Sequence, residues 1–338
     1  MIEHRFGRAT AWTLGIEEEV FLVDAETHQT SPAFSRVVPE PNDRLKPELF
    51  ECFAELTTPV VPGAEAALAE LRRLRAELAE HAAPHGILLH AAGTHALARG
   101  AGQPIVPVER YERMAAELGD RIYLQLVAGL HIHVSVPDPE TCLTAFEAVV
   151  PWLPVLLALS ANSPFADGAD TGRRSERAGR LLAMPTGGAP PLLAGWDDWT
   201  RATRGDSTRR HWDAWPRPEY GTLEVRVADM QTDVRRSAGV AAIVQALVVA
   251  LADSSPEPYD RGLYTSRRAS AAAGPPAAAD VEALAAVVEP AARSLGSWHL
   301  AEPVLTLRTE AERQLEIAAA EGIAAVPKDV VERTALAF

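Results

Sequence analysis

Four segments of the chain alternate apolar and polar residues with the period of a β-strand, and this pattern constrains the fold more than any other feature. The segments span residues 12–23, 51–58, 129–136 and 221–228. Because residues two apart in a strand share a face, each segment predicts one apolar face and one polar face. The residues predicted on the polar faces are Glu17, Glu19, Glu55, His131, His133, Ser135, Glu224 and Arg226. The pattern is typical of an antiparallel sheet that packs a core on one side.

The polar faces carry mostly glutamate and histidine. A solvated face is the ordinary explanation for any one strand, but solvated faces usually carry Lys, Thr, Ser and Gln. Carboxylates and imidazoles that share one concavity repel one another unless cations lie between them. Oxygen-rich sites with an occasional histidine suit Mg²⁺ or Mn²⁺, and these ions commonly handle nucleotide phosphates. The pattern therefore indicates a divalent metal site.

The composition narrows the classes of partner and location. With 32 Lys and Arg against 46 Asp and Glu side chains, the 338-residue chain has a net charge of −14, which argues against a nucleic-acid or anionic-membrane partner. The longest apolar stretches, 143–161 and 239–252, are too interrupted or too short for a membrane helix and are expected to be core helices. Cys52 and Cys142 have no metal-ligand or disulfide spacing, and no secretory signal is visible, so the expected location is the reducing cytoplasm.

Helical and strand patterns are interspersed along residues 1–338, which are expected to form a single α+β domain. The sequence contains no Rossmann glycine fingerprint and no phosphate-binding loop motif. The clearest helix is 64–81, which places four leucines on one stripe. Residues 253–280 are predicted to be a loop or low-complexity connector, and a helical C-terminal part is expected from about residue 280.

Several short motifs follow one another in an order that is similar to a known family. They are Gly15-Ile16-Glu17-Glu18-Glu19, Glu48-Leu49-Phe50, Glu55-Leu56-Thr57-Thr58-Pro59, Ala92-Gly93-Thr94-His95, Gly129-Leu130-His131-Ile132-His133-Val134, Leu159-Ser160-Ala161-Asn162-Ser163-Pro164-Phe165 with Asp170-Thr171-Gly172, and Trp212-Asp213 with Gly221-Thr222-Leu223-Glu224-Val225-Arg226-Val227. Each motif is weak alone, but the ordered set, which runs from about residue 12 to residue 250, is specific. It resembles the glutamate–cysteine ligase type 2 family, also called YbdK-type carboxylate–amine ligases.

The resemblance implies a glutamine-synthetase-like fold, in which a curved antiparallel sheet forms the active site on its concave face and helices pack on its convex face. It also implies an ATP-dependent ligase that forms C–N bonds. ATP phosphorylates a carboxylate, classically the γ-carboxylate of glutamate, and an amine such as that of cysteine attacks the acyl phosphate. The implied cofactor is Mg²⁺ or Mn²⁺, with ATP as co-substrate. The implied partners are small amino-acid and amine substrates, and an exposed apolar helix face would support a homodimer.

The resemblance also assigns roles to individual residues. The implied metal ligands are Glu17, Glu19, Glu48, Glu55, His131 and Glu224. Arg226 would neutralise a phosphoryl or carboxylate group, and Arg177 matches a family arginine that holds substrate. Glu18 points to the apolar face and is expected to be structural. His133 shares a face with His131 and is expected to support the ligands rather than to be one.

The chain departs from the family at two places where arginines are expected. Trp215 stands where family members usually carry an arginine, so Arg217 would have to supply that charge. In residues 264–272 two expected arginines are alanines, and Arg267 remains. Arginines at these places would contact ATP phosphates together with Arg226. Two alternatives therefore stay open: a divergent metal enzyme on the same scaffold, such as an amide or ester hydrolase or a phosphotransferase, and a non-catalytic binding protein.

Overall fold

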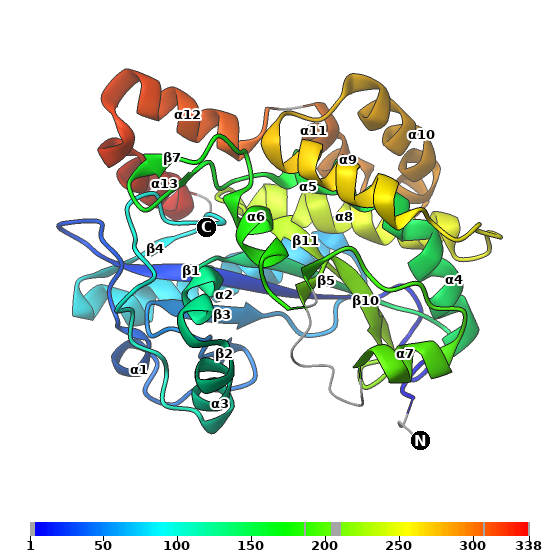
Figure 1. The fold of residues 1–338 in the computed structure, drawn as a ribbon, viewed down its shortest axis with the longest axis horizontal. Coiled ribbons are helices and arrows are strands. Elements are labelled where there is room, and N and C mark those ends of the chain that lie inside the picture. The colour runs from blue at the N-terminus through cyan, green and yellow to red at the C-terminus, as the bar shows by residue number, and fades with distance from the viewer. Residues whose placement is uncertain (1–3, 186, 204–210, 307, 337–338) are drawn as a thin grey trace.

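A seven-stranded sheet forms the centre of the computed structural model, which describes residues 4–185, 187–203, 211–306 and 308–336 (Figure 1). The strand order is β10-β11-β5-β1-β3-β2, and β4 also pairs with β1. The strands are β1 (Leu14–Asp24), β2 (Leu45–Lys46), β3 (Phe53–Thr57), β4 (Ile87–His90), β5 (Gly129–Ser135), β10 (Ala214–Arg217) and β11 (Thr222–Asp229). Every pair in this sheet is antiparallel, as the alternating pattern predicts.

The register of the sheet aligns acidic residues and histidines on neighbouring strands. The opposing pairs are Glu17–His131, Glu19–Glu55 and His133–Glu224. Directly opposed residues point to the same side of a sheet, so these side chains gather on one face. The pairing of β11 with β5 shifts by one residue between Val225 and Ala228, which is a β-bulge.

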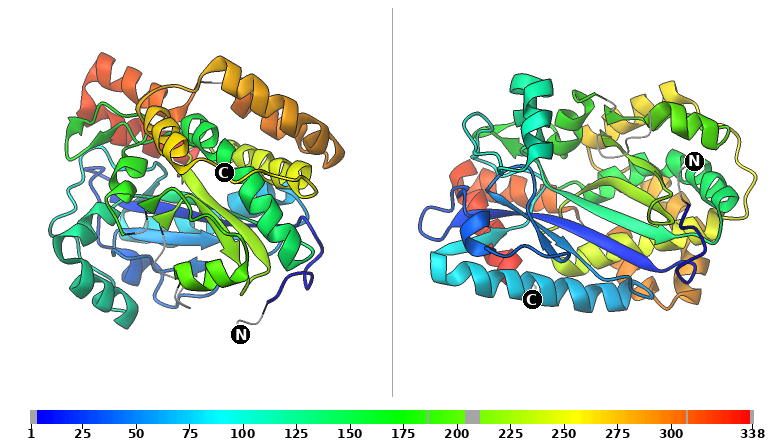
Figure 2. Two further views of the ribbon diagram at one scale, coloured as in Figure 1. Left: turned by 45° about the vertical axis from the view of Figure 1, so that its right-hand side comes forward. Right: turned by 90° about the horizontal axis from the view of Figure 1, so that it is seen from below.

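Helices cover the opposite, apolar face of the sheet (Figure 2). Those that contact the strands include α2 (Ala64–Ala82), α4 (Pro139–Val149), α5 (Leu153–Ser160) and α8 (Val234–Leu251). Their apolar side chains join those of the strands in two buried clusters. Ile16, Ile132 and Phe146 belong to the larger cluster, and Leu22 and Leu78 belong to the other. The predicted α+β arrangement of an antiparallel sheet with helices packed on one face is therefore confirmed.

Two helical stretches, Pro139–Ser160 and Val234–Leu251, are long and apolar enough to cross a membrane when judged by length and composition alone. A third candidate arises if α9 (Arg261–Ala273) and α10 (Ala278–Ser294), which are bent by 109°, count as one span. In the folded chain, 72% and 78% of the apolar windows of the first two stretches are buried. Both stretches form part of the core described above.

The remaining elements connect and flank these two layers (Figure 1). They are α1 (Phe34–Val37), α3 (Glu109–Leu118), α6 (Glu176–Leu182), α7 (Trp196–Thr203), α11 (Trp298–Thr306), α12 (Glu310–Glu321), α13 (Val326–Ala335), the 3₁₀ segments Ala83–His85, Gly119–Gln125, Val150–Trp152 and Ile323–Ala325, and the short strands β6 (Phe165–Ala166), β7 (Ala169–Asp170), β8 (Gly187–Gly188) and β9 (His211–Trp212). The prediction of a loop over residues 253–280 is wrong in part, because α9 lies within it. Asp260 caps α9 by accepting hydrogen bonds from the first backbone N–H groups of the helix.

A buried ion pair ties β1 to α2. Glu18 points to the helical side of the sheet, as predicted, and is fully buried. Arg75 of α2 donates hydrogen bonds to both carboxylate oxygens of Glu18, at 2.7 and 2.8 Å. The same guanidinium also donates to the backbone carbonyls of Gln231 and Thr232 just before α8. Glu18 lies between Glu17 and Glu19, whose side chains point to the polar face. The ion pair with Arg75 therefore helps to fix the position of β1 relative to α2, and with it the orientation of these two side chains.

Replacing Arg75 with Met is expected to lower the free energy of unfolding by about 3–5 kcal/mol, because the carboxylate of Glu18 would stay buried without a partner. Urea unfolding at pH 7, followed by circular dichroism, measures the change. Arg73→Met is the matched control. Arg73 lies on the same helix, is half exposed and pairs only with surface glutamates, so its loss should cost less than about 1 kcal/mol. Equal losses in the two variants would show that the buried pair does not hold β1.

Candidate active site

The polar face of the sheet lines a cleft across β11, β5, β1 and β3. Three adjoining cavities, of about 70, 260 and 350 Å³, make up this cleft. The middle cavity shares Glu19, His131 and Arg226 with the smallest one. It shares Glu17 and Lys46 with the largest one. The cleft is therefore continuous along the acidic face.

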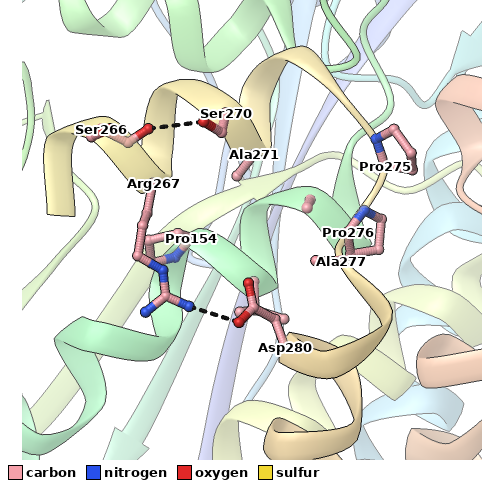
Figure 3. A pocket seen from close by; sticks show the side chains of 11 residues that line it. Pro154, Ser266, Arg267, Ser270, Ala271, Pro275, Pro276, Ala277 and Asp280 are labelled. Atoms are coloured by element: carbon pink, nitrogen blue, oxygen red, sulfur yellow. Dashed lines mark hydrogen bonds and ion pairs between the residues drawn. The ribbon is translucent and has the colours of Figure 1, made fainter. Parts of the chain in front are cut away.

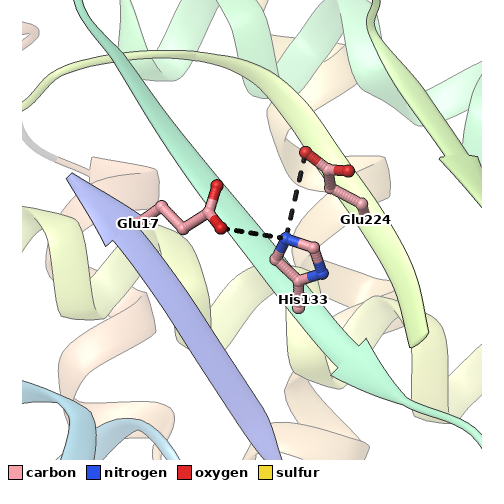
Figure 4. A group of neighbouring side chains, drawn as sticks. All are labelled: Glu17, His133 and Glu224. Atoms are coloured by element: carbon pink, nitrogen blue, oxygen red, sulfur yellow. Dashed lines mark ion pairs between the residues drawn. The ribbon is translucent and has the colours of Figure 1, made fainter. Parts of the chain in front are cut away.

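Glu17, His133 and Glu224 come from three adjacent strands and point toward one another (Figure 4). One possible ligand atom of each lies within 4.8 Å of the others. His133 Nε2 is 3.8 Å from Glu17 and 3.9 Å from Glu224 and has no hydrogen-bond partner among the described residues. Its Nδ1 lies 3.0 Å from the hydroxyl of Thr222. If that nitrogen carries the proton, the lone pair of Nε2 is left for a metal ion.

Three donors hold Glu224, two from β10 and one from its own strand β11. Its oxygens accept hydrogen bonds from the indole N–H of Trp215 at 3.1 Å, from Arg217 at 2.5 Å and from Arg226 at 2.6 Å. Burial alone would raise the pKa of Glu224, but the charges of Arg226 and Arg217 outweigh it and hold the pKa well below its usual value. The carboxylate therefore stays ionised, and Arg217 and Arg226, two of the three arginines predicted to bind phosphate, lie in the cleft.

Glu19, Glu48 and Glu55 form a second acidic group around the middle cavity. Burial and the charge of Glu48 raise the pKa of Glu19 to about 8. Burial and the charges of Glu17 and Glu48 raise the pKa of Glu55 to about 7. Burial also raises the pKa of Glu48 itself. A bound cation favours the ionised form of carboxyl groups that resist ionisation because they are buried and lie close to one another.

His131 lies between the two acidic groups. Its Nδ1 is 3.2 Å from Glu17 Oε2, and its Nε2 is 3.8 Å from Glu19 Oε1. Burial and the charge of Arg226 lower the pKa of His131 to about 4, so the ring is neutral at pH 7, which is the form that binds metals. Burial would raise the pKa of Glu17, but the hydrogen bond with His131 and the charge of His133 bring it down to about 2.

The cleft thus brings together all six residues predicted as metal ligands, and it adds His133. The chemistry of this donor set fits divalent ions: two carboxylates with an unpartnered imidazole nitrogen in one group, and three carboxylates that repel one another in the other. The alternation of β5 predicted that both histidines share this face. It could not distinguish the two, because the alternation does not show that Nε2 of His133 lies 3.8 and 3.9 Å from Glu17 and Glu224, with no hydrogen-bond partner among the described residues.

Sequence reasoning missed the side chains that hold the acidic groups at the other rim. The hydroxyl of Tyr111, on α3, lies 3.3 Å from Glu48 and accepts a hydrogen bond from Arg110 at 2.6 Å. Lys46 Nζ, on β2, is 3.0 Å from Glu55 Oε1. The two-residue strand that carries Lys46 is too short to show a period. The one available signal was that the chain has only two lysines.

Arg177, predicted to hold substrate, lines the smallest cavity from α6. Its two terminal nitrogens donate to the backbone carbonyls of Arg226 and Val227, at 3.0 and 3.3 Å, where β11 bulges. Its Nε has no partner in the part of the chain that the structure describes. Gly129 makes room for this packing, because a Cβ at that position would lie 2.4 Å from the guanidinium. Its backbone N–H donates to Glu19 at 2.5 Å.

Asp229, the last residue of β11, anchors the segment that carries α6. It accepts hydrogen bonds from the hydroxyls of Ser163 and Ser175, at 2.6 and 2.8 Å, and from the backbone N–H of Asn162 at 2.8 Å. Ser175 in turn caps the N-terminus of α6. The position of Arg177 in the cleft therefore depends on a buried carboxylate of the sheet.

Arg267 lies outside the cleft, although it was predicted to bind phosphate. It pairs with Asp280 at 3.1 Å and lines a separate cavity of about 180 Å³ among α5, α9 and α10 (Figure 3). The structure therefore does not bring it together with the other predicted arginines. The next residue, Arg268, donates two hydrogen bonds to Asp213, which lines the smallest cavity of the cleft.

In the metal-free protein, the free energy of unfolding is expected to fall by about 2 kcal/mol between pH 6.5 and pH 8. The pKa values of Glu55 and Glu19, about 7 and 8, lie above the ordinary 4.5. In this window the folded state therefore loses protons that the unfolded state has already lost, which destabilises it. Saturating Mg²⁺ should flatten the decline, because it offsets the repulsion of the ionised carboxylates. Urea unfolding at a series of pH values, once with EDTA and once with Mg²⁺, measures both effects. A free energy of unfolding that does not change with pH in EDTA would contradict the raised pKa values.

Known proteins resemble this chain in sequence. A family described as glutamate-cysteine ligase family 2 matches residues 13–332. A protein of Rubrobacter xylanophilus that carries the provisional name glutamate–cysteine ligase 2-3 is 37% identical over 273 residues, which are 76% of this chain and 74% of that protein. Both agree with the resemblance of the ordered motifs.

Two solved structures share the fold. The glutamate–cysteine ligase of Francisella tularensis, in complex with AMP, superposes with a TM-score of 0.67 at 14% identity, over 96% of this chain and 88% of that one. A bifunctional glutathione synthetase from Pasteurella multocida superposes with a TM-score of 0.70 at 15% identity, over 96% of this chain. This chain spans only 52% of that structure's chain. At these identities the likeness bears on the fold alone, and it agrees with the expected glutamine-synthetase-like architecture.

Proposed function

The chain belongs to glutamate–cysteine ligase family 2 and is a ligase that forms carbon–nitrogen bonds, and we propose that it couples an amino-acid carboxylate to a small amine with ATP and Mg²⁺. The main support is that two acidic groups, around Glu17 and Glu19, meet in one cleft together with Arg226. Buried like charges at this density require cations. Arginines beside such cations suit the phosphates of a nucleotide and the carboxylate of an amino acid.

Two sets of side chains would hold the metal ions. One set is Glu17, His133 and Glu224, with His131 adjacent, and the other is Glu19, Glu48 and Glu55. When bound, the ions neutralise phosphate oxygens and so reduce the repulsion that opposes an approaching carboxylate. The protein's own contribution is to hold the ligands in place, because nearly all of them lie on paired strands and have a second hydrogen-bonding neighbour.

The largest cavity suits the nucleoside part of ATP. It opens beside Glu17 and His133 and is lined by Leu14, Val60 and Tyr220. Tyr220 is 55% exposed, and the guanidinium of Arg217 lies 4.8 Å from the centroid of its ring. An exposed aromatic ring can stack on a base. We therefore assign the base and ribose to this arm of the cleft, with the phosphates directed toward the acidic groups.

The opposite end suits the acid substrate. The smallest cavity is lined by Arg177, Arg226, Gln125 and Glu19. These side chains offer guanidinium groups to an α-carboxylate and oxygen acceptors to an α-amino group. A substrate held there would direct its side-chain carboxylate toward the middle cavity, between the two sets of metal ligands. Glutamate is therefore the first acid to test, and cysteine is the first amine.

The reaction in this geometry has two steps. The substrate carboxylate attacks the γ-phosphorus of ATP, which gives an acyl phosphate and ADP. The amine then attacks the acyl carbon, and inorganic phosphate leaves as the amide forms. Arg226 and Arg217 border the middle cavity and would stabilise the phosphoryl oxygens during the transfer. Both are already oriented by Glu224, so little reorganisation is needed when the substrate binds.

Glutamate and cysteine together are expected to cause ADP release in the presence of ATP and Mg²⁺, with a product whose mass equals acid plus amine minus water. Glu55→Ala and His131→Ala should each reduce this release by about 100-fold or more, because each removes a side chain at the metal sites. A coupled ADP assay and mass spectrometry of the product provide the measurements. Glu80→Ala, on the exposed side of α2, is the control and should keep the wild-type rate.

Other outcomes of these assays identify the alternatives. If this pair of substrates is inactive, a screen of other acids and amines by ADP release follows. Metal-dependent hydrolysis of amides or esters without ADP would favour a divergent enzyme on the same scaffold. A melting temperature that rises with neither Mg²⁺ nor Mn²⁺, alone or with ATP, would favour a non-catalytic binding protein.

Tyr220→Ala is expected to raise the KM for ATP by about tenfold, because stacking on a base contributes about 1–3 kcal/mol. The KM for the acid substrate should stay within about twofold of the wild-type value, since the acid is assigned to the far end of the cleft. Steady-state kinetics with each substrate varied in turn provide both constants. A rise in the acid KM with an unchanged ATP KM would reverse the assignment of the two arms.

A further inference from the structure

Lys46 lies at the junction of the two larger cavities, and neither step of the proposed reaction uses it so far. The chain has 32 Lys and Arg side chains, and only Lys46 and Lys328 are lysines. Lys46 lines both the 260 and the 350 Å³ cavity. It therefore lies where the arm assigned to the nucleoside meets the part of the cleft in which the phosphoryl group would be transferred.

The contacts of Lys46 are with a predicted metal ligand. The pairing of β2 with β3 puts Lys46 opposite Glu55. Its Nζ is 3.0 Å from Glu55 Oε1 and 3.0 Å from the hydroxyl oxygen of Thr57, which itself donates to the same carboxylate oxygen at 3.0 Å. The Lys46 side chain is nevertheless 36% exposed, against 16% for Glu55. The ammonium group is thus bound on one side and open to the cleft on the other.

A metal ion at Glu55 would displace this ammonium group. Mg²⁺ binds a carboxylate oxygen at about 2.0–2.1 Å, and an ammonium group 3.0 Å from the same oxygen would be strongly repelled by the ion. Lysine has a flexible four-carbon stem and a compact charge, so it can move where a planar guanidinium could not. The cavities on both sides of Lys46 give it room to do so.

We propose that Lys46 moves from Glu55 to the γ-phosphoryl group of ATP when metal binds, and that it is a catalytic residue. In the metal-free protein it neutralises Glu55, and in the loaded enzyme it contacts the phosphoryl oxygens during transfer. The bond between the γ-phosphorus and the β,γ-bridging oxygen breaks, its electron pair leaves with ADP, and a bond from the substrate carboxylate to phosphorus forms. Lys46 stays protonated throughout. The contact with the phosphoryl group rests on the proposed function, whereas the competition with metal does not.

A Mg²⁺ titration without nucleotide tests the competition. At pH 8.5, Lys46→Met is expected to lower the Kd for Mg²⁺ by at least about fivefold, because the competing cation is gone. Lys46→Arg keeps a cation at Glu55 that moves away less readily, so its Kd for Mg²⁺ should be no lower than the wild-type value. Lys328→Met is the matched control, since it removes the other lysine, whose exposed side chain lies 3.8 Å from Glu332. Its Kd should not change.

Turnover at saturating Mg²⁺ and ATP tests the contact with the phosphoryl group. Lys46→Met should lose about 100-fold or more in kcat although it binds metal more tightly, while Lys328→Met keeps the wild-type rate. Mg²⁺ binding by Lys46→Met that equals or is weaker than wild type would overturn the competition. A wild-type kcat in that variant would overturn the catalytic role. Thermal unfolding of each variant checks that the fold is retained.

The two halves of the proposal can fail separately. If the wild-type protein releases no ADP with any acid and amine, the proposed function fails and the phosphoryl contact fails with it. The Mg²⁺ titration still decides whether Lys46 and the metal compete for Glu55. If ADP release is normal but the Kd of Lys46→Met is unchanged, the proposed function stands and the exchange is wrong.

Discussion

Repulsion between carboxylates that share one face of the sheet governs the arrangement around the cleft. Each acid is offset locally where a cation can reach it: Arg217 contacts Glu224, and Lys46 contacts Glu55. The offset is incomplete, because burial and the charge of Glu48 still raise the pKa of Glu19 to about 8. The helical side of β1 shows the opposite solution, in which the buried Glu18 is fully paired with Arg75 and no positive charge is lacking. In β1, Glu18 therefore has a structural role, while its neighbours Glu17 and Glu19 belong to the candidate active site.

Much of the acidic face could be predicted from the sequence, because the period of a strand is independent of which strand pairs with which. The alternation alone placed Glu17 and Glu19 on one side of β1 and Glu18 on the other. The same reasoning placed the acids and histidines of β3, β5 and β11 on polar faces. The fold class followed from these faces and from the apolar helices, since a one-sided sheet must be covered on its other side.

The parts that escaped prediction depend on contacts between distant segments. The unpartnered nitrogen of His133 depends on the register of β5 against β11. Lys46 enters the cleft through a strand of only two residues, which has no detectable period. In α9 a shift of one residue decides which arginine faces the cleft, because neighbouring residues on a helix point about 100° apart. Arg267 consequently faces α10, while Arg268 binds Asp213.

The bulge in β11 reverses the side of the sheet to which each of the following residues points. Glu224 and Arg226 point to the cleft, and an uninterrupted alternation would send Asp229 to the side of the helical core. Because of the extra residue, Asp229 lies opposite Gly129, and its side chain points to the side of the sheet that faces the cleft. One inserted residue thus decides on which side of the sheet the α6 segment is fastened. Deleting one residue of the bulge would turn the carboxylate of Asp229 toward the apolar core. The segment that carries α6 would then lose its attachment to the polar face of the sheet.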